Sequence, residues 1–119
     1  MTLQECYVKI GGDYNDILHR FMNENMIHKF VLKFPQDNNM ALFEESWAKK
    51  DYETAFRAMH TLKGVAQNLG FGPLYKAAAE VTESLRPSET NSGDMEKAAK
   101  LMPAVDEEYA RTIAAIKEL

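Results

Sequence analysis

Four residues between positions 60 and 67 combine a nucleophile with a cation and an open space. At 100° per residue, a helix through this segment places on one polar face His60, Lys63, Gly64 and Gln67. Neutral imidazole is a nucleophile that is abundant near neutral pH. The Lys63 ammonium, one turn from His60, would offset the charge of a group such as phosphoryl carried by that ring. This spacing predicts a site where chemistry takes place on His60.

Gly64 is an unusual residue for the middle of a helix. Glycine costs on the order of 1 kcal/mol there relative to alanine, and the neighbouring sequence gives no other sign of a helix end. A side chain at position 64 would stand beside the His60 ring and obstruct an approaching group. Each residue alone has an ordinary explanation, such as a solvated histidine or a glycine at a close helix contact, but packing does not explain the combination.

The opposite side of the same segment is apolar and predicts burial against other helices. Asp51 stands where an N-cap is expected, and the helix should end near Gly70. Pro73 then fits the first turn of a following helix, which should end by Arg86 because a proline comes next. The residues expected to face the core are Ala55, Ala58, Met59, Leu62, Val65, Ala66 and Leu69.

Further helices are expected on both sides of this pair. Capping signals predict short helices over residues 2–10 and 13–22, and a last helix from about Asp94 with a bend at Pro103. Residues 88–93 are polar, small and turn-rich, which predicts a loop.

A longer amphipathic stretch runs from about residue 25 to 50. Pro35 should kink or break its helix, and Asp37 should restart it. The residues expected to point inward are Ile27, Phe30, Val31, Phe34, Phe43 and Trp47.

No strand pattern competes with these helices, so the sequence predicts an all-α protein. Four amphipathic helices with short connections pack most simply as an up-down-up-down four-helix bundle, with the additional short N-terminal helices closing one end. At 119 residues the chain suffices for one domain but not two, so we expect a single domain over residues 1–119. His60 would then lie on an open convex face, which suits a carrier better than an enzyme with a concave pocket.

Composition limits the classes of function. A formal net charge of −4 argues against a nucleic-acid binder. No apolar run approaches the roughly 20 residues that span a bilayer, and the first five residues lack the features of a signal peptide, so we expect a cytoplasmic protein that does not bind membranes. Cys6 is the only cysteine, and His19, His28 and His60 lack the spacing of metal ligands on one helix. We therefore predict neither a disulfide nor a metal site.

A resemblance to a known family rests on residues 58–70, AMHTLKGVAQNLG. They closely resemble the signature of histidine-containing phosphotransfer domains, the intermediate carriers of bacterial phosphorelays. The similarity covers about residues 10–86 well and the C-terminal helix loosely. It implies that His60 is the phosphoacceptor and that Lys63 and Gln67 flank the phosphoryl group.

The resemblance also implies a partner. His60 would accept a phosphoryl group from the aspartate of a response-regulator receiver domain, such as that of a hybrid histidine kinase, and pass it to another receiver aspartate. The receiver would bring Mg²⁺, so we expect this chain to be a monomeric phosphoryl carrier without a cofactor, and not an enzyme. Phe56 and Arg57 on the same helix and Lys76 on the next are candidates for docking, although Phe56 could equally be tucked under a neighbouring helix.

Two other functions remain open. The phosphoacceptor region of a sensor kinase also carries a histidine on a bundle helix, but the following residue is typically acidic, whereas here it is Thr61 and no nucleotide-binding segment follows. The second alternative is a helical adaptor or interaction module without phosphotransfer activity. The presence of His60, Lys63 and Gly64 together counts against the adaptor.

Overall fold

The computed structural model describes residues 1–87 and 93–119 and contains no strand in those ranges, which confirms the predicted all-α class. The predicted loop over residues 88–93 lies mostly outside the described residues. The helical elements are α1 (Leu3–Ile10), α2 (Tyr14–Phe21), α3 (Glu24–Lys33), the 3-10 helix η1 (Phe34–Gln36), α4 (Asn39–Ala48), α5 (Tyr52–Asn68), α6 (Gly72–Leu85) and α7 (Met95–Lys117).

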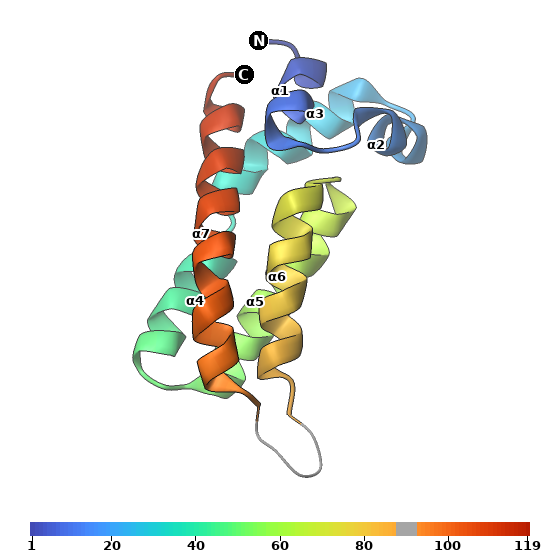
Figure 1. Ribbon diagram of the computed structural model, residues 1–119. Helices are drawn as coiled ribbons and strands as arrows, with labels where there is room; N and C mark the ends of the chain where they lie inside the picture. The colour runs from blue at the N-terminus through green and yellow to red at the C-terminus, as the bar shows by residue number, and fades with distance from the viewer. Residues whose placement is uncertain (88–92) are drawn as a thin grey trace.

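Helices α4 to α7 make up the long body of the molecule (Figure 1). Helix α5 packs against α4 and also against α6, and α6 packs in turn against α7. Helix α6 runs away from the end that holds both chain termini, and α7 returns to it. The short helices α1, α2 and α3 lie at that end, where α1 contacts α7.

Side-chain caps fix where the helices begin. Thr2 and Glu5 form the predicted capping box at the start of α1, in which each side chain accepts a hydrogen bond from the other residue's backbone N–H. The carboxylates of Asp13, Asp51 and Asp94 accept backbone N–H bonds at the starts of α2, α5 and α7. These helix starts agree with the sequence prediction. Helix α7 continues on both sides of Pro103, where we predicted a bend.

Pro35 breaks the predicted helix over residues 25–50. Helix α3 ends at Lys33, and Pro35 lies in η1, whose short turn tolerates the residue that lacks a backbone N–H. The predicted restart at Asp37 is wrong by two residues, since α4 begins at Asn39. Asp37 still prepares that start, because its carboxylate accepts the Asn39 backbone N–H at 2.9 Å.

Most of the predicted inward residues are buried, but Phe30 is not. Its side chain is 41% exposed, whereas Ile27 and Val31 on the same helix are fully buried. At 100° per residue, Phe30 lies 60° from Ile27 on the side away from Val31. It falls outside the narrow arc that α3 buries at the end of the molecule, and its ring instead contacts Phe21 of α2 at 5.9 Å between centroids.

Tyr7 joins the N-terminal helices to the end of α5. Its side chain is fully buried, and its hydroxyl donates a hydrogen bond of 2.6 Å to the carbonyl oxygen of Leu69. Burial raises the pKa of the Tyr7 phenol, so the group stays protonated and remains a donor. The backbone of Gly12 also approaches here so closely that a Cβ atom would overlap the Gly70 carbonyl oxygen. Both contacts hold the turn after α5 against the turn after α1.

We predict that Tyr7→Phe lowers the free energy of unfolding by about 1–2 kcal/mol, because the buried Leu69 carbonyl loses its partner while the ring is kept. Urea unfolding followed by circular dichroism measures this change. Tyr75→Phe is the matched control, since the half-buried Tyr75 hydroxyl has no hydrogen bond within the described residues. Equal effects of the two substitutions would contradict the assigned role of Tyr7.

Candidate functional site

Helix α5 presents His60 to solvent because its opposite face is buried. The buried residues of the helix are those predicted from the sequence, apart from the half-buried Val65: Ala55, Ala58, Met59, Leu62 and Ala66. Asp51 fixes the start of the helix, and its hydrogen bonds with Thr54 lower the pKa of the Asp51 carboxyl, which favours the charged cap. His60 lies slightly more than two turns further along, and its side chain is exposed.

Both ring nitrogens of His60 are available. Within the part of the chain that the structure describes, neither has a hydrogen-bond partner. The hydroxyl of Thr61, the next residue, donates to the Arg57 carbonyl oxygen at 2.9 Å and is turned back along the helix. The Phe56 ring lies beside the His60 ring, at 6.0 Å between centroids and a tilt of 44°. A nitrogen lone pair of neutral His60 can therefore attack an electrophile that arrives from solvent.

The structure brings Lys63, Gly64 and Gln67 to the same side of α5 as predicted, each in a different setting. Lys63 is half-buried and has no ion-pair partner among the described residues. A Cβ atom on Gly64 would meet nothing within 4 Å, so the glycine does not serve a close helix contact. Gln67 is exposed, and its backbone carbonyl accepts a hydrogen bond of 3.2 Å from Arg20 of α2.

The three predicted docking residues lie in different settings. Phe56 is half-buried and packs against the core beside His60, so it contributes to packing, while its role in docking stays a prediction. Arg57 is exposed and pairs with Glu53 of the same helix. Lys76 is exposed on α6.

Glu83 and Arg86 lie beside the site, and sequence reasoning missed them. The Arg86 guanidinium donates hydrogen bonds of 2.9 to 3.3 Å to the Glu83 carboxylate and lies 5.3 Å from the Phe56 ring centroid. The hydrogen bond from Arg86 lowers the pKa of Glu83, and the charges of Arg86, Lys63 and His60 lower it further. The Glu83 carboxylate is therefore within electrostatic reach of Lys63 and His60. In the sequence, Glu83 and Arg86 are marked only by the i, i+3 spacing of opposite charges, which is common on exposed helices.

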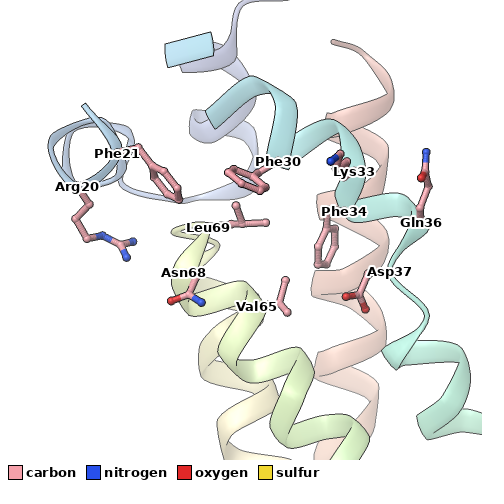
Figure 2. Close-up of a pocket in the computed structure, with 10 residues that line it drawn as sticks. All are labelled: Arg20, Phe21, Phe30, Lys33, Phe34, Gln36, Asp37, Val65, Asn68 and Leu69. Carbon is pink, nitrogen blue, oxygen red and sulfur yellow. The ribbon is translucent and has the colours of Figure 1, made fainter. Parts of the chain in front are cut away.

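An apolar groove opens next to the C-terminal end of α5 (Figure 2). It has a volume of about 580 Å³ and lies between that end of α5, helices α2 and α3, and η1. Phe30, one of the residues that we predicted to be inward, lines this groove beside Phe21. The residues that line the groove are Arg20, Phe21, Phe30, Lys33, Phe34, Gln36, Asp37, Val65, Asn68 and Leu69.

The fold and the site define an all-helical protein in which His60 lies exposed on a helix whose opposite face is buried. Residues 26–115 match the family model of the Hpt domain, so the chain belongs to the Hpt domain family. This match confirms the resemblance seen in residues 58–70, and the family consists of phosphocarrier modules that take part in histidine phosphotransfer in two-component signalling. Searches of curated proteins and of solved structures gave no match.

Among the described residues, no helix combines the length and the apolar character that crossing a bilayer requires. The same residues contain no group of three or more histidine, cysteine, aspartate or glutamate side chains placed to hold a metal ion.

We predict that Gly64→Ala raises the free energy of unfolding by about 0.5–1 kcal/mol, because alanine favours the helix and its Cβ enters open space. Urea denaturation measures the change. Gly12→Ala is the control with the opposite sign, since its Cβ would overlap the Gly70 carbonyl oxygen. A lower free energy of unfolding for Gly64→Ala would mean that the glycine is needed for packing and not for access to His60.

Proposed function

We propose that His60 is the phosphoacceptor of a phosphorelay, which takes a phosphoryl group from the aspartate of one receiver domain and passes it to the aspartate of another. The observation that carries the proposal is the exposed His60 ring, whose nitrogens have no partner among the described residues and which stands next to the open space at Gly64. This helix lies within the segment that matches the family. A convex site of this kind needs a second protein to complete it, which supports a carrier that meets receivers in turn.

The chemistry follows from the side chains present. One nitrogen of neutral His60 attacks the phosphorus of an aspartyl phosphate in line, so that an N–P bond forms while the P–O electron pair leaves with the carboxylate. The product carries close to two negative charges at neutral pH, by analogy with other phosphorylated side chains. The Lys63 ammonium offsets part of this charge, and Gln67 can donate a hydrogen bond to a phosphoryl oxygen. Mg²⁺ would come with the receiver, where it supplies charge neutralisation.

Several finer points belong to the same proposal. Helices α4 to α7 would form the up-down-up-down four-helix bundle, in keeping with their pairwise packing. The protein would act as a monomer, because one copy carries the whole His60 face. It would be located in the cytoplasm. Its partners would be receiver domains, including that of a hybrid histidine kinase. Phe56, Arg57 and Lys76 would contact them, although only Phe56 lies against His60.

We predict that His60→Gln abolishes phosphoryl acceptance and leaves the protein folded, because the exposed ring contributes little to the core. The measurement incubates each protein with a purified receiver domain phosphorylated by acetyl phosphate and follows acid-labile, base-stable label. His28→Gln, which removes another exposed histidine, is the control and should keep full acceptance. Absence of label on the wild type would contradict the proposal, and partner binding without transfer would favour the adaptor.

We predict that Gly64→Leu slows transfer from the phosphorylated receiver by about a hundredfold, because the leucine side chain would hold the reacting groups apart. The rate of transfer from the receiver to His60 is measured in samples quenched at successive times. Phosphoramidate, a small donor that reacts without a receiver domain, serves as the comparison. The rate of His60 phosphorylation by phosphoramidate should fall much less. Equal losses with both donors would show that the substitution damages the His60 ring environment and not the docking of a protein.

A further inference from the structure

Four side chains from two helices form a continuous chain beside the site. The His60 ring lies 6.0 Å from the Phe56 ring, and the Arg86 guanidinium carbon lies 5.3 Å from that same ring. These two distances keep the guanidinium carbon within about 11 Å of the His60 ring centroid. Glu83 completes the chain through its hydrogen bonds with Arg86. The charge pair at the end of α6 is therefore linked to the His60 ring through Phe56, which both His60 and Arg86 contact.

The charge balance of this neighbourhood changes when His60 carries a phosphoryl group. With an unmodified ring, Glu83 and Arg86 satisfy each other and carry no net charge together. Close to two negative charges on His60 would repel the Glu83 carboxylate and attract the Arg86 guanidinium. The planar guanidinium also matches the geometry of phosphoryl oxygens better than an ammonium does.

The pair is free to respond to such a change. Its side chains are 61% and 46% exposed for Glu83 and Arg86, and exposed ion pairs of this kind contribute little to stability. Arg86 is the C-cap residue of α6 and has an extended backbone. The guanidinium lies over the Phe56 ring, which is also in contact with the His60 ring.

We propose that Arg86 is a second cationic partner of phosphorylated His60, and that Glu83, which holds Arg86 while His60 is unmodified, opposes phosphorylation. The inference rests on the proposed function, because it requires a phosphoryl group on His60. It assigns opposite effects to two residues that are hydrogen-bonded to each other. The pair thereby sets how tightly the carrier retains its phosphoryl group.

The test measures the equilibrium distribution of label between this protein and a receiver domain phosphorylated with acetyl phosphate, after excess acetyl phosphate is removed. A change that affects only the affinity between the two proteins does not alter this equilibrium distribution, provided that little of either protein is in the complex. Glu83→Gln should raise the equilibrium constant for phosphorylated His60 about threefold, and Arg86→Gln should lower it about threefold. The double variant should lie near the wild type, and 1 M salt should reduce all three differences.

A matched control removes another exposed ion pair, Glu45 with Lys49 on α4, by Glu45→Gln with Lys49→Gln, and should leave the equilibrium unchanged. Equal equilibria for wild type, Glu83→Gln and Arg86→Gln would overturn the inference while the labelled wild type still upheld the proposed function. Shifts of the same sign in both single variants would also overturn it, since a merely structural pair behaves in that way. An unlabelled wild type would overturn both.

Discussion

Burial of the apolar face of α5 between its neighbours is the constraint on which the rest of the structure depends. Its buried face is rich in alanine, and small side chains allow α4 and α6 to approach closely. A helix that is buried on one side has no rotational freedom, so the direction of every exposed side chain is settled at the same time. His60 thus gains its orientation from the buried residues on the opposite face of α5.

The second fixed point lies at the C-terminal end of α5. Tyr7 donates to the Leu69 carbonyl, and Gly12 lets the backbone of the first turn reach Gly70. These contacts place α2 and α3 across the end of α5, where Arg20 reaches the Gln67 carbonyl and where the apolar groove opens. The N-terminal helices therefore extend the surface at the C-terminal end of the helix that carries His60, as well as closing the core.

Local signals in the sequence were enough for much of this structure. The caps at Thr2, Asp13, Asp51 and Asp94 and the apolar periodicity of α5 act within a few residues, so the helix starts and the exposed face of His60 followed from them. The exposure of Phe30 did not follow, because it depends on how narrow an arc the neighbours of α3 cover. Glu83 and Arg86 lie more than twenty residues from His60 in the chain, and only the packing of α6 on α5 brings them beside it.

The electrostatics of the site fit the needs of a carrier, which must hold a phosphoryl group and then release it. A ring surrounded by several free cations would keep a dianion too tightly, because each nearby positive charge stabilises the phosphorylated state relative to the free one. Here the half-buried Lys63 is the cation without an ion-pair partner among the described residues of the site, and Arg86 is held by Glu83. A carboxylate within electrostatic reach of the His60 ring is therefore compatible with the release that a carrier requires. In the proposed function, the Glu83 carboxylate would raise the free energy of the phosphorylated state, which favours release of the phosphoryl group.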